Sequence, residues 1–98
     1  MKDIFAKFNR LLENRIRLAI MSALVVNESI DYNTLRQLLG VTDGNLASHI
    51  KTLENNKMVN VMKITSGKRI TTHYSITDKG KKAFEDHLDA LEKITGIK

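Results

Sequence analysis

The sequence predicts a mostly helical α+β fold in which a β hairpin stands before the last helix. Apolar residues recur at helical spacing through residues 3–55 and again through residues 78–95. Between them, residues 58–76 are rich in β-branched residues and alternate in polarity around a glycine-containing loop. A length of 98 residues suits a single compact domain, which we place over residues 1–98.

The composition excludes several classes of protein. Apolar residues make up 42% and charged residues 28%, which is typical of a folded domain. The absence of cysteine excludes disulfides, a thiolate nucleophile and cysteine-based zinc sites. The longest nearly unbroken apolar run, residues 18–26, falls short of the ~18 residues that a membrane span needs. The charged N-terminus does not fit a signal peptide, so we expect a cytoplasmic protein without a membrane partner.

Net charge favours a polyanionic partner. Sixteen Lys and Arg against eleven Asp and Glu give a net charge of +5. The excess is +2 over residues 1–40, +3 over residues 41–76 and zero over residues 77–98. A basic middle segment is compatible with nucleic-acid binding, although many basic domains bind none.

Two helical segments are predicted before residue 27. The first covers residues 3–12, and the second begins near residue 14 and ends at the polar residues 27–29. The sequence leaves open whether the chain breaks at Asn9 or at Asn14.

A short helix and a longer one follow, each with recognisable end signals. Asn33 is the predicted cap of the short helix, Tyr32 is expected to pack on its first turn, and Gly40 closes it. Thr42 is the predicted cap of a helix over residues 43–55, which places Leu46, Ile50 and Leu53 on its buried side.

The last third combines a hairpin with a long helix. Strands are predicted at residues 58–64 and 70–76, joined by the basic turn at 65–69. Thr77 or Asp78 caps a helix over residues 78–95, and Gly80 is expected to weaken its first turn.

This order of elements is that of a winged helix-turn-helix, and three stretches resemble the MarR/ArsR-type transcription regulators. They are NRIRLAIMSAL (14–24), LGVTDGNLASHIKTLE (39–54) and YSITDKGKK (74–82), and the resemblance covers roughly residues 12–92. It implies a fold with a two-stranded β wing, a regulator that binds double-stranded DNA, and a homodimer.

Polar residues on the outer side of the 43–55 helix are the candidate DNA readers. Asn45, Ser48, His49 and Thr52 fall at i, i+3, i+4 and i+7 on the side opposite the apolar stripe. Such donors and acceptors suit base edges in a major groove that admits one helix, whereas a merely solvated face would more usually carry Glu and Lys. The full set of candidate DNA-binding residues is Thr42, Asn45, Ser48, His49, Lys51, Thr52, Lys57, Lys68 and Arg69.

The basic members of this set are expected to contact phosphates. Lys51 and Lys57 flank the helix, and the wing tip at 65–69 carries Lys68 and Arg69 for the backbone or the minor groove. A solvated turn is the alternative for the tip. Arg15 and Arg17 are weaker candidates.

Metal binding and catalysis are not supported. His87 lies near Asp86 and Asp89, but a solvated carboxylate-rich helix explains this group better than a metal site. The sequence contains no phosphate-binding glycine loop and no nucleophile–base grouping. We therefore expect no enzyme, no metal and no cofactor, and the sequence identifies no small-molecule effector.

Apolar stripes outside the predicted core indicate a dimer. A core over about residues 14–76 leaves terminal helices at about 3–12 and 78–95 with apolar residues in excess of what so small a chain covers. The alternative is that both helices pack on their own domain. The predicted interface residues are Ile4, Phe5, Phe8, Leu12, Phe84, Leu88, Leu91 and Ile94.

We therefore expect a homodimeric, sequence-specific DNA-binding regulator that acts as a repressor. The alternatives are a winged-helix module for protein contacts and a non-specific architectural DNA binder.

Overall fold

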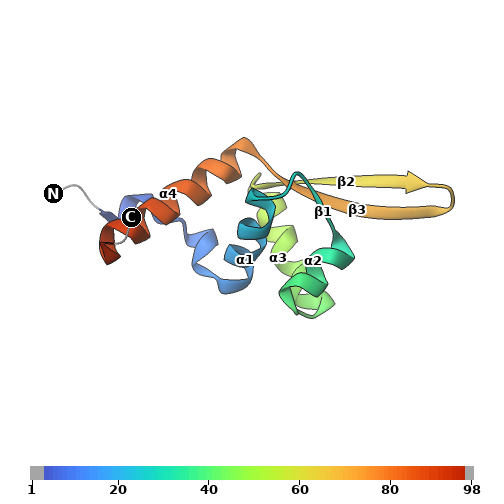
Figure 1. Ribbon diagram of the computed structural model, residues 1–98, viewed down its shortest axis with the longest axis horizontal. Coiled ribbons are helices and arrows are strands. Elements are labelled where there is room, and N and C mark those ends of the chain that lie inside the picture. The colour runs from blue at the N-terminus through green and yellow to red at the C-terminus, as the bar shows by residue number, and fades with distance from the viewer. Residues whose placement is uncertain (1–3, 97–98) are drawn as a thin grey trace.

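The computed structural model describes residues 4–96, with the side chain of Ile4 outside the description. In these residues the 3-10 helices η1 and η2 precede four α-helices and three strands (Figure 1). The elements are η1 Ile4–Lys7, η2 Arg10–Glu13, α1 Arg15–Val25, β1 Ile30–Asp31, α2 Tyr32–Leu39, α3 Asp43–Asn55, β2 Val59–Ser66, β3 Arg69–Ile76 and α4 Asp78–Thr95.

The molecule is elongated, because the hairpin and the last helix extend in opposite directions. Its extents are 57 × 24 × 23 Å. The β2–β3 hairpin projects from one end, and the far half of α4 lies beside η1 at the other end (Figure 1). No helix within residues 4–96 is both long and apolar enough to cross a membrane.

The N-terminal segment is two short 3-10 helices where the sequence predicted one helix. The chain breaks at both asparagines that the sequence left open. The side chain of Asn9 accepts a hydrogen bond from the Leu11 N–H at 2.9 Å and caps η2. The side chain of Asn14 accepts from the N–H groups of Ile16 and Arg17 and caps α1. Both side chains thus compete with a continuous helix for backbone donors.

The short helix α2 begins two residues earlier than predicted. Asp31, not Asn33, is its cap, because the Asp31 carboxylate accepts hydrogen bonds from the Thr34 N–H at 3.2 Å and from the Thr34 hydroxyl at 2.6 Å. The predicted roles of Gly40 and Thr42 are confirmed: Gly40 ends α2 with a φ of 64°, and the Thr42 hydroxyl accepts from the Asn45 N–H.

The wing belongs to a three-stranded antiparallel sheet with the order β1-β3-β2. The two-residue strand β1 was not predicted, since it is too short to show a pattern, and it pairs Ile30 with Tyr74. Strands β2 and β3 pair from Val59 with Ile76 to Ser66 with Arg69. The turn therefore has two residues, and Gly67 at its first position has a φ of 62°, which favours glycine.

The core extends beyond the predicted range of 14–76. Leu46, Ile50 and Leu53 are buried as expected. Leu12 and Phe84, which the sequence placed in the terminal stripes, are also buried in the same cluster. The N-terminal segment and the first half of α4 are thus part of the domain itself.

Candidate nucleic-acid interface

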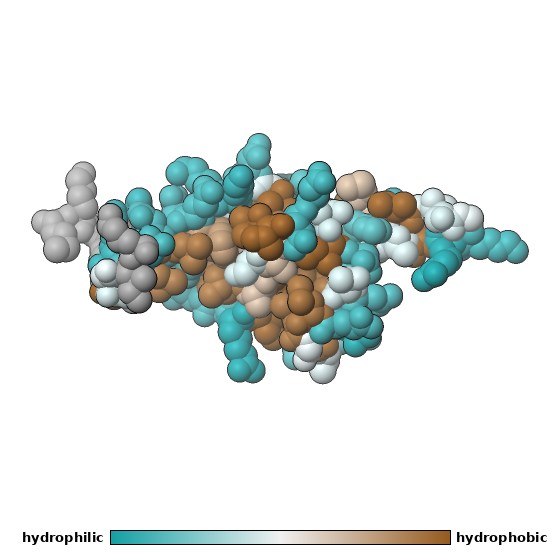
Figure 2. Space-filling view, viewed as in Figure 1, coloured by the Kyte–Doolittle hydropathy of each residue, from teal (hydrophilic) through white to brown (hydrophobic). Residues whose placement is uncertain are grey.

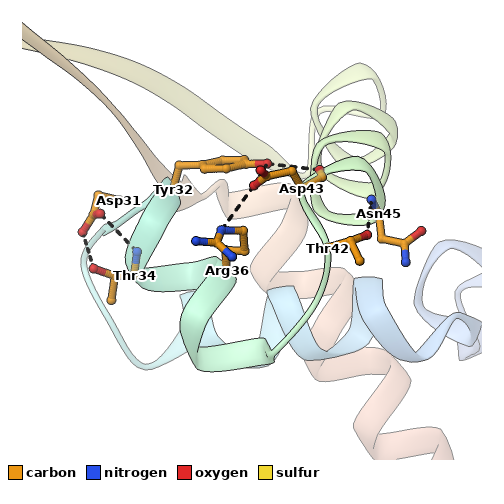
Figure 3. Close-up of polar contacts among 7 residues, drawn as sticks. All are labelled: Asp31, Tyr32, Thr34, Arg36, Thr42, Asp43 and Asn45. Atoms are coloured by element: carbon orange, nitrogen blue, oxygen red, sulfur yellow. Dashed lines mark hydrogen bonds and ion pairs between the residues drawn. The ribbon is translucent and has the colours of Figure 1, made fainter.

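The turn between α2 and α3 is held by side chains from both helices (Figure 3). The Tyr32 hydroxyl donates to the backbone carbonyl of Asp43 at 3.1 Å, and Arg36 Nε lies 3.2 Å from Asp43 Oδ1. Arg36 therefore offsets a carboxylate at the N-terminus of α3, where that charge would otherwise repel a phosphate. Tyr32 is the first residue of α2 rather than the residue before its cap, and its ring packs beside that of Tyr74.

The outer side of α3 presents the predicted polar residues unequally. Asn45 and Ser48 are exposed, and the Asn45 amide extends away from α2 in Figure 3. Thr52 is half-buried and its hydroxyl donates to the Ser48 carbonyl at 3.2 Å. The side chains with the most unrestricted access to a groove are therefore those in the first half of α3.

His49 is half-buried because it contacts α1. Its Nδ1 lies 3.0 Å from Nη1 of Arg17, whose Nε donates to the Leu11 carbonyl at 2.7 Å. Burial, and then the positive charge of Arg17, lower the pKa of His49 below its ordinary value. Arg17, a weak candidate in the sequence, is thus half-buried and hydrogen-bonded to His49 of α3.

The predicted basic residues around α3 are accessible. Lys51 and Lys57 are exposed, and Lys57 adopts a left-handed φ of 63° in the turn after α3. Its carbonyl accepts a hydrogen bond from the Thr77 hydroxyl at 2.7 Å, which fixes that turn. Arg15 is also exposed, and it lines a depression of about 400 Å³ with Thr42 and Asn45. Arg15, a weaker candidate in the sequence, therefore lies where it could contact a phosphate next to the start of α3.

The wing tip is hydrophilic and exposed. Lys68 and Arg69 stand at the end of the hairpin, and hydrophilic residues surround this end in Figure 2. Three apolar wing residues are also exposed. Met62 and Ile64 lie on β2, and Ile70 lies on β3 next to Arg69. A long arm with a positively charged end can reach a DNA backbone beyond the contact of α3.

The predicted dimer residues divide into covered and exposed groups. Leu12 and Phe84 are covered by their own chain, and Phe8 is half-buried. The Ile4 side chain lies outside the described residues. The remaining members are exposed: Phe5 by 67%, Leu88 by 38%, Leu91 by 37% and Ile94 by 53%. Next to them is an apolar groove of about 740 Å³, whose lining includes Phe5, Phe8, Leu18 and Leu91.

His87 is buried, and not on a solvated face as the sequence indicated. It is 3% exposed, its Nδ1 accepts a hydrogen bond from the Asn9 N–H at 3.1 Å, and its ring meets the edge of Phe8. Burial lowers its pKa, against the opposing charge of Glu13. Across residues 4–96, no three side chains of His, Cys, Asp or Glu are grouped so that they could hold a metal ion.

Comparison with known proteins agrees with this architecture. Residues 16–95 match the family model of a winged helix DNA-binding domain. The uncharacterized protein MJ0432 of Methanocaldococcus jannaschii is 33% identical over 79 residues, which cover 81% of this chain and 86% of that protein. A transcriptional regulator homologue from Pyrococcus horikoshii OT3 has a TM-score of 0.84 and 32% identity, with 90% of this chain and 87% of that chain covered.

A more distant structure shares the fold. A Porphyromonas gingivalis W83 protein classed in the MarR family of regulators has a TM-score of 0.69 and 18% identity, covering 89% of this chain and 80% of that chain. The helices, the wing and the exposed side of α3 define a winged helix-turn-helix protein of the DNA-binding class, not an enzyme. The resemblance predicted from the sequence is confirmed. The chain belongs to the winged helix DNA-binding domain family.

Proposed function

We propose that the protein is a homodimeric repressor that binds a specific duplex site, with α3 in the major groove and the wing on the backbone or in the minor groove. The cytoplasmic location expected from the sequence is part of this proposal. We expect repression by occlusion: a dimer bound within a promoter by two helices and two wings would exclude polymerase from the same DNA.

The observation that carries the proposal is the exposed polar surface at the start of α3. Asn45 and Ser48 face solvent there, Arg15 lines the same depression as Asn45, and the α2–α3 turn is fixed by Tyr32 and Arg36. A rigid helix end with an amide, a hydroxyl and nearby cations provides base contacts and phosphate contacts together.

Exposed apolar residues support the dimer. Phe5, Leu88, Leu91 and Ile94 lie at the end of the molecule opposite the wing, so association there leaves α3 and the wing of both chains accessible. A symmetric contact between two such surfaces covers the apolar residues of both chains at once.

The two alternatives make different demands on the same surface. A neutral or acidic outer side on α3 would favour a protein-contact module, whereas this side is polar with cations around it. A non-specific DNA binder needs the cations but not the placed amide of Asn45.

Selection from a pool of random duplexes tests the proposal directly. We expect the recovered fragments to share a motif with two inverted half-sites, because two symmetric protomers present two copies of α3. Fragments that bind without a common motif would favour an architectural DNA binder. Failure to retain any duplex at low salt would favour a protein-contact module.

The Asn45→Ala variant tests base readout by α3. We expect it to weaken binding to the selected duplex by about 1–3 kcal/mol per half-site, with little effect on a scrambled duplex, because an Asn amide pairs with base edges. Fluorescence anisotropy with both duplexes measures this difference. The matched control is Asn55→Ala, at the last residue of the same helix and ~15 Å along its axis. Equal losses on both duplexes would mean that Asn45 only positions the helix.

A further inference from the structure

The contact between Arg17 and His49 joins the recognition helix to α1 through a hydrogen bond with a fixed direction. Nη1 of Arg17 lies 3.0 Å from Nδ1 of His49. A guanidinium carries only donors and stays protonated, so the imidazole nitrogen must be the acceptor. Nδ1 of His49 therefore carries no proton, and the neutral ring has its proton on Nε2.

Arg17 itself is held in place. Its Nε donates to the Leu11 carbonyl at 2.7 Å, so two nitrogens of one planar group are engaged at once. The fork geometry fixes the orientation of the guanidinium, and hence the direction from which it meets His49. The imidazole is thus positioned by a side chain from a different helix.

The other ring nitrogen of His49 is accessible. Among the described residues, no buried side-chain nitrogen or oxygen lacks a hydrogen-bond partner. Nε2 of His49 has no partner within that part of the chain, so it reaches solvent, on the same side of α3 as Asn45 and Ser48. The ring therefore presents one N–H donor toward the surface that we assign to DNA.

We propose that Arg17 is a positioning residue for DNA readout, which holds His49 in the tautomer with Nε2 protonated and restricts it to hydrogen-bond acceptors on the DNA. This inference rests on the proposed function. In the major groove the acceptors are guanine N7 and O6, adenine N7 and thymine O4, whereas cytosine presents its N4 donor. His49 can thus donate a hydrogen bond to guanine, adenine or thymine at the base that it contacts, but not to cytosine.

The first test concerns the full-length protein without DNA. Nitrogen-15 NMR of the imidazole rings distinguishes the two tautomers and follows the titration of each histidine. We expect the wild type to show His49 with Nδ1 unprotonated. The same tautomer is expected in Arg17→Lys, which retains a donor, but a mixture in Arg17→Met, which retains the apolar stem only. A protonated Nδ1 in the neutral wild-type ring would overturn the proposal, and this result needs no variant to fold.

The second test uses the duplex recovered by selection. We expect Arg17→Met to weaken binding to that duplex by roughly fivefold or more relative to Arg17→Lys, with less than about twofold change on a scrambled duplex. The base that His49 contacts is the one at which the His49→Ala variant loses its sequence preference. Selection with Arg17→Met should recover duplexes that carry cytosine at this same base. The control for loss of charge is Lys81→Ala, at an exposed site on α4.

The outcomes separate the two proposals. If the wild type selects no motif, the proposed function fails. If the wild type selects a motif and Arg17→Met selects the same motif with the same His49 tautomer, the proposed function stands and the role of Arg17 is wrong.

Discussion

Gly80 lies in the first turn of α4, where the backbone carbonyl of Met58 approaches it closely. A Cβ built at this position would meet Met58 O at 2.3 Å and the Ile76 side chain at 3.1 Å. We expect Gly80→Ala to lower the free energy of unfolding by about 1–3 kcal/mol despite its better helix propensity, because a backbone carbonyl cannot move aside as a side chain can. Urea unfolding measures this, with Gly44→Ala as the control. A Cβ at Gly44 meets nothing within 4 Å, so that variant should gain about 0.4–1 kcal/mol.

His87 makes stability depend on pH near neutrality. Its folded pKa lies below the unfolded value of about 6.5, so the unfolded chain binds more protons there. Stability is therefore complete above about pH 6.5 and falls as the pH drops toward the folded pKa, by at most about 1.4 kcal/mol per pH unit for one proton. His87→Gln, which retains an acceptor for the Asn9 N–H, should flatten this dependence in unfolding curves between pH 7 and 5. The pKa of His49 is also lowered, so this histidine adds to the slope with the same sign.

At the scale of elements, local signals predicted the end of α2 and the start of α3, misplaced the start of α2 by two residues, and did not reveal long-range contacts. Gly40 and Thr42 act within a few residues, so their roles are visible in the sequence. By contrast, β1 exists because Ile30 and Asp31 meet β3, more than forty positions away, and no local pattern reveals that pairing. In the same way, Gly80 looked like a weak point because Met58 is not adjacent in the sequence. Arg17 looked like a surface arginine because His49 is 32 positions away.

The wing is the element whose contribution to DNA binding is most easily isolated. Lys68→Ala combined with Arg69→Ala should weaken binding to all sequences similarly, because we expect these residues to contact phosphates and not bases. The double variant removes four cations from a dimer, which should flatten the log–log salt dependence by roughly 3.6, at about 0.9 for each phosphate no longer neutralised. Titrations over a range of salt concentrations measure the slope. Lys81→Ala with Lys82→Ala removes the same charge from α4, and an unchanged slope in the wing variant would remove the wing from the interface.

At the scale of the molecule, parts of both terminal segments pack into the core of their own domain. The stripe on α4 was predicted correctly, whereas the N-terminal stripe lies on two 3-10 helices and not on one helix. Periodicity also does not say which partner covers a stripe. Leu12 and Phe84 are covered by their own chain, whereas Leu88, Leu91 and Ile94, farther along α4, are exposed. The predicted dimer therefore depends on the far half of α4 and the exposed part of the N-terminal segment. A variant that tests dimer formation must therefore change a residue on this smaller surface.

Leu88→Glu tests whether that surface joins two chains. Leu88 is 38% exposed in the single chain, so a carboxylate there is solvated in a monomer but becomes unpaired and buried on both sides of a symmetric contact. We expect light scattering to show a dimer for the wild type and a folded monomer for Leu88→Glu. The matched control is Leu38→Glu on α2, where the leucine is 63% exposed, and it should remain dimeric. The monomeric variant should retain its phosphate contacts but lose the gain from linking two half-sites, which we expect to be inverted and centred ~10 base pairs apart. A wild type that is monomeric at micromolar concentration and binds an asymmetric site would contradict the dimer while leaving the winged helix intact.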